Sequence, residues 1–274
     1  MKLIDFHTHT NASDGLLAPQ ELVQKALKKN LIALAITDHD TIAGLAEVKD
    51  YASDKIDLIA GIEFSVEYET GSFHLLGLKI DPNNQNLLKI SQNLQTDREQ
   101  RFYQIIEQLK EVGIKIPPAE FKLPKSNESL GRPHLARIMV KYGYGETLND
   151  IFKKYLTKGK PGYVKKKKLS LKKAVSSIKQ AGGIPIIAHP SSLNFKNFIE
   201  FKSLLKRFIQ AGVEGLEVFS SMHTPEQVEI FYKIAQKYDL YISGGSDFHG
   251  DRNEKLGYYN HQPIPLELYD FLKE

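Results

Sequence analysis

The sequence predicts an α/β protein whose mainly parallel sheet is interrupted by a helical insertion. Short apolar segments alternate with amphipathic helical segments over the first 80 residues, and the alternation resumes after about residue 170. This alternation is typical of βα units that build a parallel sheet. Residues 85–165, between the two stretches, show helical periodicity only. We therefore expect one α/β body that carries a helical insertion.

The first stretch predicts four strands and two helices. Residues 31–37 form a continuous apolar run, which is typical of a strand buried on both faces. Leu22, Val23 and Ala26 recur at helical spacing, and Pro19 suits the first turn of their helix. The expected strands lie at residues 2–7, 31–37, 58–66 and 73–80, and the expected helices at residues 18–30 and 41–53.

The middle of the chain predicts a long helix at residues 84–112, after which Pro117, Pro118 and Pro124 break the chain. Shorter helices are expected at residues 133–142 and 147–157. Residues 122–168 contain 13 Lys and Arg against 3 acidic residues, a charge of +10; because the whole chain carries +4, the rest carries −6. A basic segment of this kind favours an anionic substrate or partner.

The last stretch returns to alternation. Gly182 and Gly183 end one helix, and Gly212 ends the next. The expected helices lie at residues 171–181, 196–211 and 225–238, and the expected strands at residues 184–188, 213–219 and 240–245. The α/β domain is thus expected to comprise residues 1–84 and 166–274, with residues 85–165 as a basic insertion that caps the substrate.

Composition limits the chemistry and the cellular location. The chain has no cysteine, which excludes disulfides and thiolate metal sites, so any metal must have nitrogen and oxygen ligands. No apolar run approaches the roughly 20 residues that a bilayer span requires. The first residues lack the long apolar stretch of a signal peptide. We expect a cytoplasmic protein without a membrane or protein partner.

Polar residues recur where the predicted strands end, which is where parallel α/β barrels place their active sites. His7 and His9 are two residues apart, so both side chains point to the same side of an extended strand and can reach one metal ion. Asp247 and His249 have the same spacing. Glu63 is a candidate bridging carboxylate. Imidazole and carboxylate ligands suit Zn²⁺, Mn²⁺ or Fe²⁺.

Each candidate has an ordinary structural interpretation when it is considered alone. A single His-x-His pair rarely binds metal, Asp247 could cap a helix, and His189 before Pro190 could be a buried, hydrogen-bonded histidine. The same ligand chemistry at five strand ends favours a metal site over these separate explanations.

Seven motifs occur in order between residues 5 and 250. They are His7-Thr8-His9-Thr10 followed by Ser13-Asp14-Gly15, Thr37-Asp38-His39-Asp40, Gly61-Ile62-Glu63, His74-Leu75-Leu76-Gly77, Gly131-Arg132-Pro133-His134, Ala188-His189-Pro190 and Ser246-Asp247-Phe248-His249. Together they resemble the motifs of the polymerase and histidinol phosphatase (PHP) family. The insertion motif, Gly131-Arg132-Pro133-His134, most resembles the branch of 3′,5′-nucleoside bisphosphate phosphatases and 5′→3′ exoribonucleases.

The resemblance implies a distorted (β/α)₇ TIM-like barrel, the PHP fold, with two to three divalent metal ions. Carried over by position, the first ion would bind His7, His9, Glu63 and Asp247, which are also the expected catalytic residues. A second would share Glu63 and add His74 and His189. A third would bind Asp14, His39 and His249. Some relatives have a histidine at the position of Asp14; the carboxylate favours Mn²⁺, while Zn²⁺ or Fe²⁺ stay open.

Such ions would lower the pKa of a bound water and provide a hydroxide that attacks the phosphate ester, so no protein nucleophile is required. Arg132 and His134 are the best candidates for holding the substrate, because arginine matches phosphate with two parallel donors. Lys160 and His223 are further candidates. His261 is expected to be structural, and the lysines at 165–168 are either a solvated surface or an RNA contact.

The expected function is metal-dependent hydrolysis of a nucleotide phosphate ester, as a bisphosphate phosphatase, an exoribonuclease on short single-stranded RNA, or both. Histidinol-phosphate phosphatase is the alternative on the same fold, but the Arg132-Pro133-His134 insertion argues against it. A non-enzymatic accessory module is a remoter alternative, because none of the nine expected ligands is missing.

Overall fold

The computed structural model describes residues 1–51, 56–121, 131–250 and 254–273. The predictions at Pro124 and at the end of the second helix lie outside these residues. The chain forms two compact units: unit 1 comprises Met1–Ser91 and Lys168–Glu274, and unit 2 comprises Gln92–Lys167.

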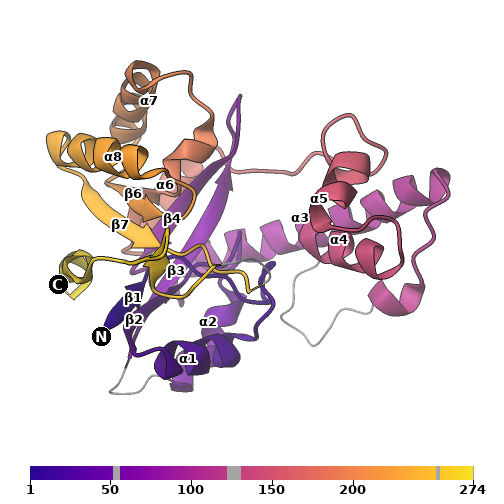
Figure 1. Ribbon diagram of the computed structural model, residues 1–274, viewed down its shortest axis with the longest axis horizontal. Coiled ribbons are helices and arrows are strands. Elements are labelled where there is room, and N and C mark those ends of the chain that lie inside the picture. Colours follow the sequence, from indigo (N-terminus) through magenta and orange to yellow (C-terminus); the bar gives the residue numbers. More distant parts are fainter. Residues whose placement is uncertain (52–55, 122–130, 251–253, 274) are drawn as a thin grey trace. The chain divides into compact units, whose positions relative to one another are not determined.

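Unit 1 is built on a seven-stranded sheet whose strands follow one another in chain order (Figure 1). The first three strands are parallel to each other, as are the last three, whereas the fourth is antiparallel to both of its neighbours. The strands are β1 Leu3–Asp5, β2 Leu31–Ile36, β3 Asp57–Val66, β4 Phe73–Leu78, β5 Ile184–Ile187, β6 Gly215–Ser220 and β7 Tyr241–Gly245.

Hydrogen bonds at and just beyond the ends of β1 and β7 join the two edges of this sheet. The Phe6 amide donates to the Gly244 carbonyl at 3.2 Å, and the His9 amide donates to the Phe248 carbonyl at 2.9 Å. Thr8 and Phe248 form a parallel bridge between these donors. Gly245 allows the close approach, since a Cβ there would lie 2.2 Å from the His7 Cβ. The predicted fold class, a distorted TIM-like barrel, is confirmed.

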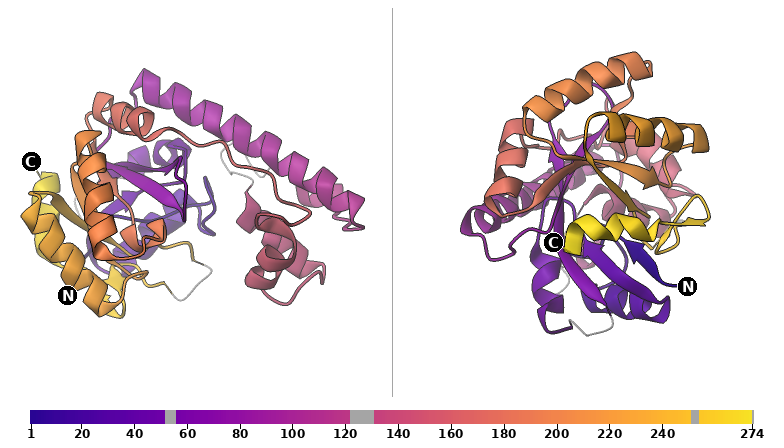
Figure 2. Two further views of the ribbon diagram at one scale, coloured as in Figure 1. Left: turned by 90° about the horizontal axis from the view of Figure 1, so that it is seen from above. Right: turned by 90° about the vertical axis from the view of Figure 1, so that its left-hand side faces the viewer.

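Helices cover the outside of the barrel strands (Figure 2). Side-chain caps start three of them: Ser170, Asn197 and Thr224 each accept a backbone amide of the first turn. Their apolar faces pack on the sheet, where residues such as Phe201 and Phe231 are fully buried. The helices are α1 Pro19–Lys28, α2 Ala43–Val48, α6 Leu171–Gln180, α7 Phe198–Gln210, α8 Pro225–Lys237 and α9 Asp270–Lys273, and a short hairpin, β8 Tyr258–Tyr259 and β9 Gln262–Pro263, precedes α9.

The connection between β3 and β4 differs from the simple βα alternation expected from the sequence. Only six residues separate Val66 from Phe73, which is enough for a hairpin but too short for the helical crossover that parallel strands need. The reversal of β4 places its first residues at the same edge of the barrel as the last residues of the parallel strands.

Unit 2 consists of helices around a core of its own. The helices are α3 Gln85–Glu111, α4 Arg132–Lys141 and α5 Leu148–Ile151, the last continued by a wide turn over Phe152–Leu156. α3 begins in unit 1 and continues into unit 2. Phe102, Leu135 and Met139 are central to the core. No helix in the described part of the chain is long and apolar enough to cross a membrane.

Candidate metal centre

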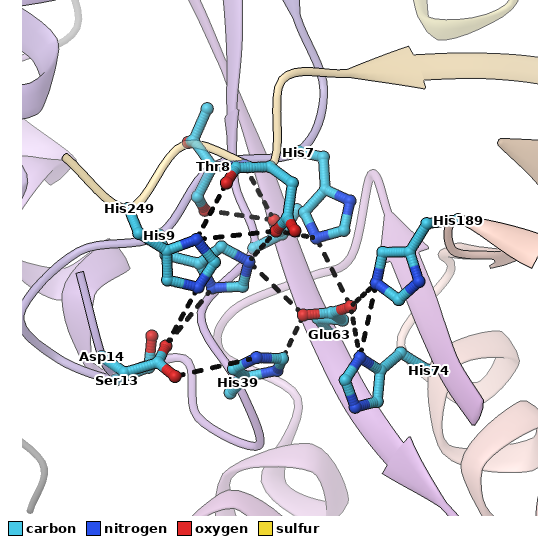
Figure 3. Close-up of polar contacts among 12 residues, drawn as sticks. His7, Thr8, His9, Ser13, Asp14, His39, Glu63, His74, His189 and His249 are labelled. Atoms are coloured by element: carbon cyan, nitrogen blue, oxygen red, sulfur yellow. Dashed lines mark hydrogen bonds and ion pairs between the residues drawn. The ribbon is translucent and has the colours of Figure 1, made fainter. Parts of the chain in front are cut away.

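Nine side chains that can bind metal lie together at the edge of the barrel where the parallel strands end (Figure 3). His74, near the start of the antiparallel β4, reaches the same place as the residues after the parallel strands. All nine are buried or half-buried. The structure thus brings together every residue that was predicted as a metal ligand: His7, His9, Asp14, His39, Glu63, His74, His189, Asp247 and His249.

Glu63 lies at the centre of the group and is fully buried on β3. Its Oε1 atom is 3.0 Å from His74 Nδ1, 3.1 Å from His189 Nε2 and 3.4 Å from His7 Nε2. Its Oε2 atom is 2.7 Å from His39 Nδ1. The two oxygens therefore face different histidines, which is the geometry a carboxylate needs to bridge two ions.

Asp247 faces the two histidines that follow β1. Its Oδ1 atom lies 3.1 Å from His9 Nε2 and 3.3 Å from His7 Nε2. The His9 Nε2 atom is also 3.4 Å from Glu63 Oε2. Two histidines and two carboxylates thus direct their donor atoms at a common volume.

Asp14 brings a carboxylate to the opposite side of His9. Its Oδ1 atom is 3.5 Å from His249 Nε2 and 4.0 Å from His9 Nδ1, while its Oδ2 atom is 3.9 Å from His39 Nε2. The donor atoms of these four residues all lie within 4.8 Å of one another. These separations are longer than a direct hydrogen bond and leave room for a shared cation.

Two buried nitrogen atoms in the group test whether it fits metal ions. Within the described residues, His7 Nε2 and His9 Nδ1 have no hydrogen-bond partner. Buried polar atoms are normally satisfied, because an unmade hydrogen bond costs about 1–3 kcal/mol. Nitrogen atoms left without partners and carboxylate oxygens aimed at the same volume fit divalent ions such as Mn²⁺, Zn²⁺ or Fe²⁺.

The two central carboxylates are ionised at neutral pH. Burial alone would raise the pKa of Glu63, but the charges of His39, His74 and His7 outweigh it and hold the pKa well below its usual range. The pKa of Asp247 is also lowered against the effect of burial, chiefly by His7. Ionised carboxylates are the form that binds metal.

The histidines divide into two groups. Burial and the neighbouring His249 lower the pKa of His9 to about 3. Burial, only partly offset by Glu63, lowers the pKa of His74 to about 4. Both are therefore neutral at pH 7 and ready to bind metal. Burial alone would lower the pKa of His7, but three surrounding carboxylates raise it well above 6.5, so an ion there must displace a proton.

The backbone is strained where the candidate ligands leave their strands. Three non-glycine residues at the site have left-handed backbones, Asp40 (φ 58°), His189 (φ 24°) and Asp247 (φ 53°). Such conformations persist only where the surrounding structure holds them, and they concentrate at functional sites.

Four buried carboxylates beside the ligands had no role in the sequence prediction. Asp5 accepts the backbone amides of Ser246 and Gly257 and the Ser246 hydroxyl, which ties β1 to the segment that carries Asp247. Asp38 accepts from the loop before Asp14. The four are Asp5, Asp38, Asp40 and Glu217. The first three could have been found from the sequence because each lies within two residues of a predicted ligand. Glu217 could have been found as a lone carboxylate within an apolar strand.

Arg132 begins α4 in unit 2 and stacks on the Phe152 ring, with its Cζ atom 5.6 Å from the ring centroid. Its guanidinium donates to the Leu156 carbonyl at 3.2 Å. Arg101 donates to the Val164 carbonyl at 2.8 Å. Burial and the charges of Arg132 and a third arginine, Arg98, lower the pKa of Arg101 to about 10. Among the described residues, no carboxylate neutralises Arg101 or Arg132.

The remaining predicted substrate contacts lie in different environments. His134 is half-buried beside Phe102 in unit 2, and Lys160 is exposed. His223 is buried in unit 1, where its Nδ1–H donates to the Val218 carbonyl at 2.8 Å. In that tautomer its Nε2 atom is an acceptor, which does not suit a phosphate oxygen.

The remaining basic residues singled out in the sequence are the lysines at 165–168 and His261. Lys167 forms an ion pair with Asp97 in unit 2. His261 is exposed, in the turn between β8 and β9.

A distorted barrel with a histidine- and carboxylate-rich centre at its strand ends defines a class of metal-dependent hydrolases. Two solved structures share the fold over nearly the whole chain. The fold matches a protein from Bifidobacterium adolescentis described as a metal-dependent phosphoesterase (TM-score 0.85, 30% identity, 97% of this chain and 93% of that one). It also matches a Chromobacterium violaceum protein described as an amidohydrolase and solved with bound sulfate (TM-score 0.84, 35% identity, 97% and 95%).

The sequence comparisons agree. The PHP domain model matches residues 5–122. The 3′,5′-nucleoside bisphosphate phosphatase of Chromobacterium violaceum is 35% identical, over 96% of this chain and 93% of that protein. The 5′-3′ exoribonuclease of Haemophilus influenzae is 35% identical, over 90% of each. The chain belongs to the PHP family and is a metal-dependent phosphoesterase.

Proposed function

We propose that this phosphoesterase acts on nucleotides that carry two phosphates, as a 3′,5′-nucleoside bisphosphate phosphatase, and that it also removes nucleotides from the 5′ end of short RNA. The observation that carries the proposal is the arginine cluster of unit 2. The charge of Arg132 helps to lower the pKa of Arg101, burial and the charge of Arg98 lower the pKa of Arg132, and no carboxylate among the described residues compensates the pair. Phosphate is the natural counter-charge for such a cluster.

The nine residues of the metal centre would hold two to three divalent ions, with Mn²⁺ favoured. The first ion would bind His7, His9, Glu63 and Asp247. When bound, these ions would supply an activated water and a positive field for the phosphate oxygens. The second ion would share Glu63 and bind His74 and His189, and the third would bind Asp14, His39 and His249.

The protonation states of the ligand side chains affect how readily metal binds. Glu63 and Asp247 are ionised and His9 is neutral, so His7 is the member of the first ligand set that must lose a proton when metal binds. Arg132 would hold a phosphate by two parallel hydrogen bonds, and His134 and Lys160 would assist it. His223, which lacks a free donor in its observed tautomer, is the weakest of the four proposed substrate contacts.

The relatives' names support a nucleotide substrate but name two activities, a phosphatase and an exoribonuclease. The distinguishing experiment is a rate comparison with purified protein and Mn²⁺ on adenosine 3′,5′-bisphosphate, adenosine 5′-monophosphate, histidinol phosphate and a 5′-phosphorylated RNA of a few nucleotides. The bisphosphate should be hydrolysed far faster than the monophosphate, and RNA should be shortened from its 5′ end.

Equal rates on the mono- and bisphosphate would contradict a two-phosphate site. Efficient hydrolysis of histidinol phosphate alone would replace the proposal with the alternative function. An RNA labelled at the 3′ end separates the two nucleotide activities, because only stepwise removal from the 5′ end leaves a ladder of progressively shorter labelled products.

A further inference from the structure

Glu217 is a buried carboxylate in the barrel that no predicted ligand set uses. It lies within β6, is fully buried, and has two polar contacts. Its Oε1 atom is 2.9 Å from His7 Nδ1, and its Oε2 atom accepts the His189 backbone amide at 2.6 Å. A buried carboxylate is costly unless such contacts compensate it. Each of its oxygens thus has one partner, and both partners belong to the proposed metal centre.

The contact with His7 determines which ring nitrogen faces the centre. An ionised carboxylate can only accept, so the hydrogen of this bond must be on Nδ1 of His7. The other nitrogen, Nε2, lies 3.4 Å from Glu63 Oε1 and 3.3 Å from Asp247 Oδ1. With Nδ1 engaged by Glu217, Nε2 is the atom available to an ion. Carboxylates that orient a metal-binding histidine in this way also increase its basicity.

The contact with His189 acts on the backbone. His189 has a φ of 24°, a conformation that a non-glycine residue holds only with support from its surroundings. The short hydrogen bond from its amide to Glu217 supplies such support. The same backbone position places His189 Nε2 3.1 Å from Glu63 Oε1. Glu217 thus contacts two ligands that follow different strands, β1 and β5.

The strand itself directs Glu217 inward. The pairing of β6 with β7 shifts between Glu217, which is opposite Ser243, and Phe219, which is opposite Gly244. Val218 is therefore an extra residue, a bulge of the kind that redirects side chains next to active sites. Glu217 and its neighbours Leu216 and Val218 are all fully buried, as expected for a strand that is covered on both faces.

We infer that Glu217 is a positioning residue that fixes the His7 ring and the His189 backbone in the arrangement that divalent metal requires. This inference rests on the metal centre of the proposed function, but it concerns a residue outside the ligand sets. The two hydrogen bonds hold the ring and the backbone amide in place. The role requires that the carboxylate remain an acceptor on both oxygens.

The test is Glu217→Gln, which keeps the shape but replaces one acceptor oxygen with a donor. Mn²⁺ affinity, measured from the EPR signal of the free ion, should fall about 10–100-fold. In the Zn²⁺-loaded protein, NMR should show a slowly exchanging His7 Nδ1–H in the wild type, and the variant should lose or shift it. Circular dichroism checks that the variant is folded.

Two matched controls separate this role from general effects. Glu214→Gln removes a carboxylate from the residue directly before β6. In the wild type, Glu214 pairs with Lys179 at the surface. Ser243→Ala removes a buried hydroxyl opposite Glu217 that has no partner among the described residues. Both variants should keep wild-type Mn²⁺ affinity and the His7 Nδ1–H signal.

Unchanged Mn²⁺ affinity and an unchanged His7 signal in Glu217→Gln would overturn the role of Glu217 and leave the proposed function standing. A wild-type protein that binds no Mn²⁺ would contradict the proposed function instead. If Glu217→Gln does not fold, the wild-type spectrum still decides, because the role requires a hydrogen on His7 Nδ1.

Discussion

Arg132 is held from two sides, by the Phe152 ring and by the Leu156 carbonyl, yet its charge is uncompensated among the described residues. We predict that Arg132→Ala lowers kcat/KM on a nucleoside bisphosphate by about 10–100-fold, because a hydrogen bond between charged groups contributes about 1.5–3 kcal/mol. Steady-state kinetics measure the loss, and elemental analysis should show unchanged metal content.

Lys141→Ala is the matched control for Arg132, since Lys141 is an exposed cation on the same helix, α4, paired with Glu120. Its kinetics should equal those of the wild type. Wild-type kinetics for Arg132→Ala on every phosphate substrate would rule out a phosphate contact at this position.

The buried His223 should make stability depend on pH. Burial lowers the pKa of His223 below its usual 6.5 in the folded chain. As pH falls below about 6.5, the unfolded chain takes up a proton that the folded chain does not, so the free energy of unfolding decreases. His223→Asn, which keeps a donor for the Val218 carbonyl, should make this decrease shallower. Urea unfolding of the metal-free protein between pH 7.5 and 5.5 measures it.

The readout for His223 is the slope with pH and not the absolute stability, which the smaller side chain will lower through lost contact with Phe231. His261→Asn, at an exposed residue with a left-handed backbone that asparagine tolerates, is the control. A slope in His223→Asn equal to that of the wild type would mean that the buried imidazole is protonated as readily as in the unfolded chain.

The location of the candidate ligands at strand ends was predictable from the sequence, whereas the residues that contact them from behind were not. His7, His9 and Asp247 lie at or within two residues of the ends of predicted strands, so their place at strand ends can be deduced locally. The partner of His7, Glu217, is 210 positions away in the chain. Local periodicity does not encode a contact over this distance in the chain.

At the scale of elements, the seam between β1 and β7 depends on Gly245. A Cβ at this position would lie 2.2 Å from the His7 Cβ and 2.6 Å from the His7 backbone nitrogen. Gly245→Ala must therefore move the end of β7 away from His7. We predict a loss of about 1–3 kcal/mol in the free energy of unfolding and weaker Mn²⁺ binding. Chemical unfolding and Mn²⁺ titration measure the two effects.

Gly145→Ala in unit 2 is the comparison for Gly245. The nearest atom to a Cβ there is the Ile151 Cδ1, at 2.9 Å, and the end of a side chain can move more easily than backbone. This variant should keep wild-type Mn²⁺ binding. Tight Mn²⁺ binding and full stability in Gly245→Ala would show that the seam is more adaptable than its close contacts indicate.

The alternation of strands and helices predicted most elements of the barrel, but it did not predict the direction of β4. The apolar run at residues 73–80 fits either direction, and only the short connection after Val66 favours a hairpin. The reversal matters for the site, because it makes the second residue of β4, His74, a ligand candidate instead of a residue beyond the strand's end.

At the scale of the whole molecule, metal should stabilise the two units unequally. All nine candidate ligands belong to unit 1, whereas the core around Phe102 and Leu135 belongs to unit 2. A ligand that binds only the folded form at 100 times its dissociation constant adds about 2.7 kcal/mol. Mn²⁺ should therefore slow hydrogen exchange in β1, β3 and β7 and leave the core of unit 2 unchanged, as read by mass spectrometry.

Ca²⁺ at the same concentration is the control for a general effect of divalent charge, because it prefers six to eight oxygen ligands and the centre is rich in nitrogen. It should protect unit 1 much less than Mn²⁺ does. Equal protection by both ions, or protection confined to unit 2, would argue against the centre as the binding site.

The hairpin turn between β3 and β4 offers an attachment point for a reporter. The turn is exposed at Glu69, and its neighbours Thr70 and Ser72 bond to residues 192–193, just after His189. Because the chain contains no cysteine, Glu69→Cys would introduce the sole thiol. A fluorophore attached there would report events at the rim of the centre through its emission, with no background labelling to subtract.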